Sequence, residues 1–194
     1  IQVGNEVTNG LLWPEGLKPN YDNIARFISS GIRACRAVKP EIPLMIHLDN
    51  GGNNEMYRDW FDHYMERGED FDYIGLSYYP FWHGTTENLT SVLKNVASTY
   101  KKDVMVAETS WAYTLDDGDD DSNTVPSKVT ADNLKKYDIS PQGQADEIRA
   151  VAEAVNNIGD NDGDGDKTNG ANGDKITGVL SNTCLLYTSP SPRD

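Results

Sequence analysis

Short apolar runs alternate along the chain with longer stretches in which apolar residues recur every three or four positions. The runs are typical of buried strands, and the stretches are typical of amphipathic helices. The clearest helical stretch covers residues 21–38, and Pro40 follows it as a stop signal. Read in this way, the sequence predicts strands over 2–7, 43–48, 72–79, 103–109 and 176–180, and helices over 21–38 and around 56–64, 89–100 and 141–155.

Strict alternation of strands and helices predicts an α/β fold with a parallel sheet and right-handed crossovers. Five strands and four helices fit either an open sheet or part of a (β/α)8 TIM barrel. The chain contains neither GxGxxG nor GxxxxGK[ST], so a nucleotide-binding sheet has little support.

Polar residues gather where the predicted strands end: Asn5 and Glu6, His47 and Asp49, Ser77, Tyr78 and Tyr79, and Glu108 and Thr109. The carboxyl ends of parallel strands carry the chemistry of such folds. A carboxylate that ends an apolar strand is costly to bury unless it has a partner or a function. Two carboxylates across a barrel mouth suit glycoside hydrolysis, in which their separation decides between retention and inversion. The alternative is that each glutamate is a structural hydrogen-bonding residue.

The charge balance restricts the partners. The chain has 17 Lys and Arg against 31 Asp and Glu, a formal net charge of −14. Nucleic acids and anionic membrane surfaces attract basic proteins, so neither is an expected partner. No apolar run approaches the roughly 18–20 residues that cross a bilayer.

Three segments carry a family resemblance. GNEVTNGLLWPEG (4–16), DYIGLSYYPFWHG (72–84) and VMVAETSWAYT (104–114) resemble, in this order, segments of the family 53 glycoside hydrolases, the endo-β-1,4-galactanases. The likeness extends over residues 1–158. It implies a (β/α)8 barrel that hydrolyses β-1,4-galactan side chains of pectin, the type I arabinogalactans, with retention.

The resemblance also implies roles for single residues. Glu6 would be the acid/base and Glu108 the nucleophile, while Asn5 would bind the 2-hydroxyl of the sugar. Tyr79, or alternatively Tyr78, would contact the nucleophile, and His47 would line the site.

Aromatic residues follow several strand ends and are candidates for stacking on galactose rings. The alternative is packing between loops, because aromatic rings bury well wherever they lie. Trp60 falls on a helical apolar stripe, which predicts a core position. The loop candidates are Trp13, Phe81, Trp82, Trp111 and Tyr113.

A dense acidic loop has the spacing D-x-D-x-D-x-N, formed by Asp117, Asp119, Asp121 and Asn123. Alternate oxygen ligands can converge on Ca²⁺, and the family resemblance implies a structural calcium ion between loops 7 and 8. The ligands from loop 8 would lie beyond the genuine sequence, so we expect the site to be incomplete in this chain. The alternative is a solvated acidic loop. A second acidic run, over 160–172, lacks the bidentate ligand of an EF-hand and is interpreted as an insertion.

A complete barrel needs about 250 residues, and the resemblance places residue 1 in strand 4. We therefore expect residues 1–180 to form the C-terminal part of one catalytic barrel, strands 4 to 8, which is inactive alone. Residues 181–194 read as a foreign or disordered tail. The polymeric substrate implies a secreted or cell-surface protein, and a monomer is expected.

Two other functions stay open. A related retaining enzyme, such as a mannanase or cellulase, shares the Asn-Glu and Glu pair but would lack LLWPEG. A non-catalytic calcium-binding or carbohydrate-binding fragment would need neither Glu6 nor Glu108.

Overall fold

The helices begin at the capping residues that the sequence offers. The computed structural model describes residues 1–116, 135–158 and 178–180. Each main helix is preceded by a side chain that accepts a hydrogen bond from the backbone N–H three residues later. These caps are Asn20 before α1 (Tyr21–Val38), Asn53 before α2 (Asn54–Met65), Thr85 before α3 (Thr86–Tyr100) and Ser140 before α5 (Pro141–Asn156). Across the described ranges, no helix is both long and apolar enough to span a membrane.

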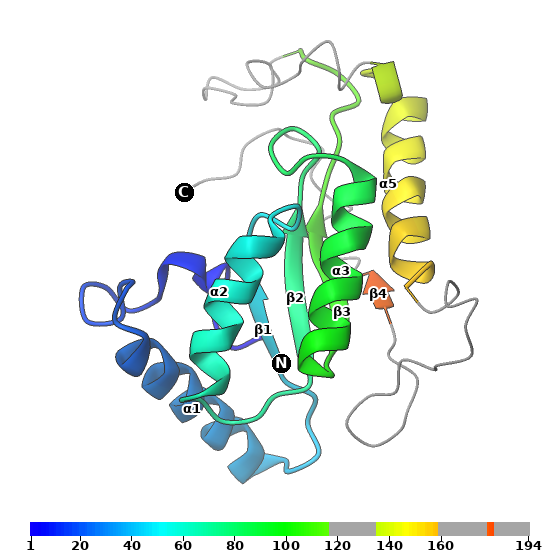
Figure 1. The fold of residues 1–194 in the computed structure, drawn as a ribbon. Helices are drawn as coiled ribbons and strands as arrows, with labels where there is room; N and C mark the ends of the chain where they lie inside the picture. The colour runs from blue at the N-terminus through cyan, green and yellow to red at the C-terminus, as the bar shows by residue number, and fades with distance from the viewer. Residues whose placement is uncertain (117–134, 159–177, 181–194) are drawn as a thin grey trace.

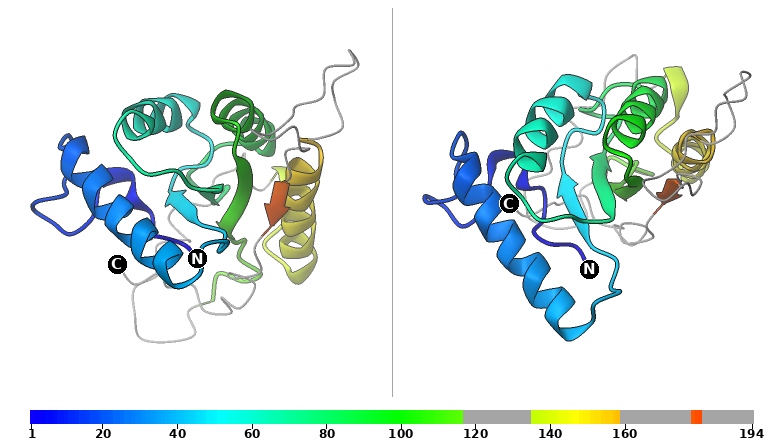
Figure 2. Two further views of the ribbon diagram at one scale, coloured as in Figure 1. Left: turned by 90° about the horizontal axis from the view of Figure 1, so that it is seen from below. Right: turned by 60° about the horizontal axis from the view of Figure 1, so that its bottom comes forward.

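The strands form one parallel sheet in the order in which they occur along the chain (Figure 1). They are β1 (Met45–Leu48), β2 (Tyr73–Tyr78), β3 (Asp103–Thr109) and β4 (Gly178–Leu180). Helices follow the outer side of the sheet, and each contacts the next (Figure 2). Parallel pairing with alternating helices agrees with the predicted part of a (β/α)8 barrel.

The first predicted strand, over 2–7, is wrong in extent. Gln2 forms an isolated parallel bridge to Met45, and the Val3 N–H donates to the Met45 carbonyl over 2.9 Å. The backbone then turns, because Gly4 has φ 83° and Glu6 has φ 44°, which no strand residue adopts. A short 3-10 helix, η1 (Val7–Asn9), follows directly.

The core lies between the sheet and the helices. Alternate strand residues supply one side of it: Ile46, Leu48, Ile74, Leu76, Val104 and Val106. Trp60 on α2 is fully buried, as predicted, and stacks on Tyr64 with ring centroids 5.4 Å apart. Its indole N–H also donates to the Val7 carbonyl over 3.2 Å, so the core tryptophan fixes the start of η1.

One carboxyl group is buried behind the sheet. Glu147 on α5 has no exposed surface, and its Oε1 accepts a 3.3 Å hydrogen bond from the Thr109 hydroxyl at the end of β3. Its Oε2 is buried and has no hydrogen-bond partner among the residues that the structure describes. Burial raises the pKa of Glu147 to about 8, against the smaller opposing effect of the Thr109 hydrogen bond. The folded chain therefore holds a proton on Glu147 at neutral pH.

This proton makes the free energy of unfolding depend on pH. Between the ordinary carboxyl pKa and about 8, the folded state binds one more proton than the unfolded state. The contribution of Glu147 to the free energy of unfolding is therefore fully present below the ordinary carboxyl pKa. It falls as the pH rises from there to about 8, above which it is lost. The effect is worth roughly 3–5 kcal/mol. We expect Glu147→Gln, which stays neutral, to reduce the loss of melting temperature between pH 5 and pH 9. The matched control is Glu153→Gln at an exposed position of the same helix. Equal pH dependence in the two variants would contradict the assignment.

Candidate active site

Side-chain alternation places three polar residues on the inner face of the sheet, opposite the helices. On β1, Ile46 and Leu48 pack in the core, so His47 faces inward. On β2, Leu76 and Tyr78 are core residues, so Ser77 and then Tyr79 share the inner face with His47. The predicted strand-end residues His47 and Tyr79 are therefore brought to one surface. Ser77, which we did not predict as a site residue, stands between them.

A bulge in β3 brings Glu108 to the same face. Leu76 pairs with Val106, but Ser77 pairs with Glu108, so Ala107 is an extra residue in the ladder. If β3 were regular through Ala107, Glu108 would share the core-facing side of Val106, because side chains two residues apart point to the same face of a strand. The extra residue turns the carboxylate inward instead.

Glu6 reaches the site from the turn before η1. Its φ of 44° is left-handed, an uncommon conformation for a residue with a β-carbon. Gly4 has φ 83°, and a β-carbon there would lie 2.5 Å from Val7 Cγ1, so only glycine fits. Together with the bond from Trp60 to Val7, this turn fixes the direction of the Glu6 side chain.

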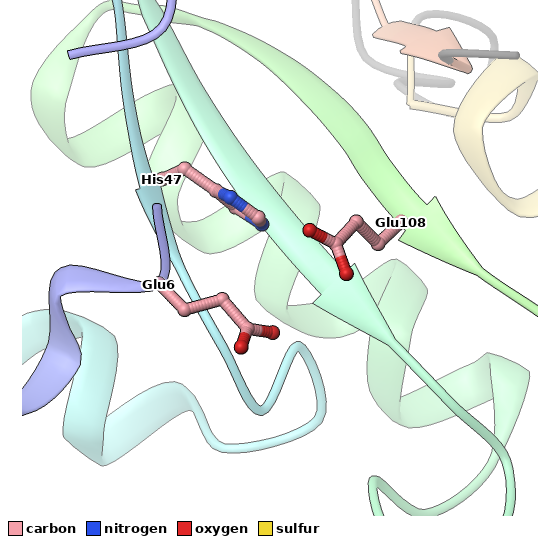
Figure 3. Close-up of side chains that lie close together, drawn as sticks. All are labelled: Glu6, His47 and Glu108. Atoms are coloured by element: carbon pink, nitrogen blue, oxygen red, sulfur yellow. The ribbon is translucent and has the colours of Figure 1, made fainter. Parts of the chain in front are cut away.

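The two carboxylates and the imidazole meet at close range. One carboxylate oxygen of Glu6, one of Glu108 and one ring nitrogen of His47 all lie within 4.8 Å of one another. Figure 3 shows the three side chains pointing toward one another from three segments of the chain. The Ser77 hydroxyl donates to Glu6 Oε1 over 2.6 Å, and the Tyr79 hydroxyl donates to Glu108 Oε2 over 2.8 Å.

His47 is linked to this pair through Ser77. Its Nδ1 lies 3.1 Å from the Gln2 amide nitrogen, which is a donor, so Nδ1 accepts and the ring proton is on Nε2. Nε2 is 2.9 Å from the Ser77 hydroxyl oxygen. Burial lowers the pKa of His47, against the opposing effect of the Glu108 and Asp49 carboxylates. A neutral, fully buried ring therefore supports Ser77, and neither ring nitrogen is directed at solvent.

Asn5 lies beside this network. Its side-chain oxygen accepts a 2.9 Å hydrogen bond from the same Gln2 amide nitrogen. Gln2 therefore connects Asn5 with His47. It was not predicted as a site residue, and its position at the start of an apparent strand gave no signal.

The aromatic candidates separate into exposed and packed residues. Trp13 is 64 % exposed and Trp82 is 41 % exposed, so both have ring surface available to a ligand. Trp111 is only 2 % exposed; it stacks on Phe81 with centroids 4.6 Å apart, and its N–H donates to the Asp138 carbonyl. The expectation that Trp111 stacks on a sugar is therefore corrected: this ring packs between loops, while Tyr113 is partly exposed.

The predicted calcium ligands Asp117, Asp119, Asp121 and Asn123 lie outside the described residues, as does the second acidic run, 160–172. Within the described part of the chain, the cluster of possible metal-ligating side chains is Glu6, His47 and Glu108. These residues form the carboxylate site itself.

Curated galactanases align in sequence with most of this chain. A 42 % identical protein, the endo-β-1,4-galactanase of Bacillus subtilis, aligns over 159 residues, which are 82 % of this chain and 35 % of the relative. The probable arabinogalactan endo-β-1,4-galactanase A of Aspergillus oryzae is 37 % identical over 165 residues, 80 % of this chain and 45 % of the relative. The chain therefore spans between a third and a half of the length of these relatives.

Solved structures of galactanases and of a family 53 catalytic domain also match most of the chain. The family 53 catalytic domain of Ignisphaera aggregans superposes with a TM-score of 0.74 at 31 % identity, covering 93 % of this chain and 46 % of the other. A fungal β-1,4-galactanase gives a TM-score of 0.70 at 30 % identity, covering 93 % and 50 %. A xylanase from Cellvibrio japonicus, at 15 % identity and a TM-score of 0.54, shares the fold. The chain is thus part of a (β/α)8 barrel.

The family model supplies the remaining evidence. The model for glycosyl hydrolase family 53 matches residues 1–166, which include the turn of Glu6 and the bulge of Glu108. Both carboxylates of the candidate site therefore lie inside the matched region. The chain belongs to glycosyl hydrolase family 53.

Proposed function

We propose that this chain is part of a retaining endo-β-1,4-galactanase that hydrolyses β-1,4-galactan, with Glu6 as acid/base and Glu108 as nucleophile. The observation that carries the proposal is the approach of the two carboxylates to within 4.8 Å at the strand ends. Retaining enzymes hold the pair about 5–5.5 Å apart, whereas inverting enzymes leave about 6.5–9.5 Å for a water molecule. The names of the Bacillus and Aspergillus relatives support galactan as the substrate.

The hydrogen bonds suggest how the steps would proceed. Tyr79 holds Glu108 by one oxygen, so that the carboxylate can attack the anomeric carbon and form a glycosyl ester. Ser77 holds Glu6 Oε1, and the other oxygen would carry the proton that the leaving oxygen receives. In the second step Glu6 takes a proton from water, which attacks the anomeric carbon and releases Glu108.

The substrate contacts are part of the same proposal. Asn5 would bind the 2-hydroxyl of the sugar, and Trp13 and Trp82 would offer exposed ring faces to galactose units. His47 would hold the Ser77 hydroxyl, which in turn donates to Glu6. We further propose galactan side chains of pectin as the natural substrate. Because such a polymer cannot enter cells, we propose that the protein is secreted or lies at the cell surface. We also propose that it works as a monomer.

The catalytic roles can be tested in a complete barrel. In a chimera, residues 1–166 of this chain replace the matching segment of the Bacillus subtilis relative, which supplies the remaining strands. We expect Glu6→Gln and Glu108→Gln each to lower kcat on β-1,4-galactan by about 10²–10⁴-fold, because each removes a group that acts in the transition state. Glu15→Gln, at an exposed position of the same N-terminal segment, is the matched control.

The leaving group separates the two roles. An aryl β-galactoside with an acidic phenol needs little protonation, so Glu6→Gln should still release the phenol in a burst, whereas Glu108→Gln should not. Product anomers followed by proton NMR should show retention. Full turnover in both variants would exclude this mechanism and favour a non-catalytic fragment. Faster hydrolysis of mannan or cellulose than of galactan would favour the related retaining enzymes.

We also propose that the acidic loop binds one structural Ca²⁺ through Asp117, Asp119, Asp121 and Asn123. The support is the alternating spacing of oxygen ligands in the sequence. We expect Ca²⁺ at 100 times its Kd to stabilise the chimera, in which the Bacillus subtilis relative supplies the remaining strands and loops, by about 2.7 kcal/mol, measured as a rise in melting temperature that a chelator reverses. Asp119→Asn combined with Asp121→Asn should abolish the rise, while Glu41→Gln should not. An unchanged melting temperature would mean a solvated acidic loop.

A further inference from the structure

A histidine that the proposed mechanism does not use is bonded to the tyrosine that holds the nucleophile. His83 lies in the turn after β2. Its backbone N–H donates to the Tyr79 carbonyl over 2.9 Å, and the Tyr79 backbone N–H donates to His83 Nδ1 over 3.0 Å. The two rings are also in contact, with centroids 5.7 Å apart. The Tyr79 carbonyl also accepts from the Trp82 backbone N–H over 3.0 Å, whereas the Tyr79 N–H is bonded to the His83 ring.

These bonds matter because Tyr79 stands beyond the strand ladder. The register of β2 with β3 ends at the pair of Tyr78 and Thr109. The next residue, Tyr79, carries the hydroxyl that donates to Glu108 Oε2 over 2.8 Å. The His83 bonds hold the backbone of Tyr79 at the point where the ladder no longer does, so they set the position of its phenol ring.

The surroundings of His83 favour a neutral ring. Because Nδ1 accepts the Tyr79 N–H, the ring proton must be on Nε2. Burial lowers the pKa of His83, against the opposing effect of the Asp49 carboxylate after β1 and of a hydrogen bond to the Ser77 backbone. The turn is also enclosed, since a β-carbon on Gly52 would lie 1.8 Å from the His83 carbonyl oxygen.

We propose that His83 is a positioning residue, whose neutral ring fixes the backbone of Tyr79 so that the Tyr79 hydroxyl meets the Glu108 carboxylate. A proton added to Nδ1 converts the acceptor into a donor, so the Tyr79 N–H loses its partner and the phenol loses its fixed position. That Glu108 reacts rests on the proposed function, whereas the coupling of His83 to Tyr79 does not.

The coupling is tested by NMR on the full chain, without substrate. The chain has three histidines, so ¹⁵N labelling of histidine gives three rings, and His83→Asn identifies the relevant one. We expect the His83 ring with its proton on Nε2 at neutral pH. The Tyr79 amide proton should shift upfield with the same midpoint as His83 protonation. A proton on Nδ1 at neutral pH, or a Tyr79 amide that ignores this titration, would overturn the proposal even if galactan hydrolysis were confirmed.

The effect on the reaction is tested in the chimera with two His83 variants. His83→Phe keeps an aromatic ring but removes the acceptor, and it should lower kcat by roughly 10- to 100-fold, with KM changed much less, the scale expected when a catalytic group is displaced by about an ångström. His83→Asn keeps an acceptor oxygen near the position of Nδ1 and should recover most of this loss. Equal losses in the two variants, or a change confined to KM, would exclude the positioning role.

Two further variants test whether the effect is specific to the turn of His83. Gly52→Ala keeps the His83 side chain but forces the His83 backbone to move, because the added β-carbon would lie 1.8 Å from the His83 carbonyl oxygen, so it should also lower kcat. His63→Phe is the matched control, because His63 lies on the exposed side of α2 and stacks on Tyr21. We expect it to leave kcat unchanged. Loss of kcat in His63→Phe but not in Gly52→Ala would contradict the proposal. A chimera without galactanase activity would leave the NMR result as the deciding measurement.

Discussion

The alternation of side chains along parallel strands is the constraint on which the site depends. On each strand, one set of residues must pack against the helices, and the core accepts Ile46, Leu76 and Val106 for this purpose. The other set is thereby directed to the inner face, where the strand ends of a barrel carry the chemistry. His47 on β1 and Ser77 on β2 contact each other on the inner face because the residues next to them along each strand point into the core. Packing on one face thus determines the polar arrangement on the other.

Both carboxylates depart from this regular pattern. Glu108 reaches the inner face because the bulge at Ala107 interrupts the side-chain alternation of β3, and Glu6 does so from a left-handed turn after a single bridge. Such irregular backbone costs free energy and persists only where the surroundings enforce it. The enforcing contacts are visible: the Trp60 indole holds the carbonyl of Val7, and the Tyr79 hydroxyl holds Glu108.

The contrast between the regular strands and these two irregular segments explains which features could be predicted from the sequence. The helices were predictable because apolar period and caps are local signals, and α1 and α5 begin where Asn20 and Ser140 allow. Glu6 and Glu108 were found by their positions at strand ends and by family resemblance, but neither the turn nor the bulge that directs them was predictable. The roles of Gln2, Ser77 and His83 depend on contacts between distant segments, which no local pattern contains. Trp111 shows the same limit, since its contacts with the Phe81 ring and the Asp138 carbonyl, from other segments, make it a packing residue.

The inner face combines negative charge with neutral donors. His47 and His83 lie close to carboxylates, which would raise the pKa of an imidazole, yet burial has the larger effect and keeps both pKa values low. Protonated rings would neutralise part of the negative charge on Glu108, the nucleophile of the proposed mechanism. Neutral rings supply hydrogen bonds without doing so. In the hydrolysis that we propose, the sugar ring develops positive charge in the transition state. Negative charge left uncompensated beside it stabilises that state more than the ground state, which is the condition for catalysis.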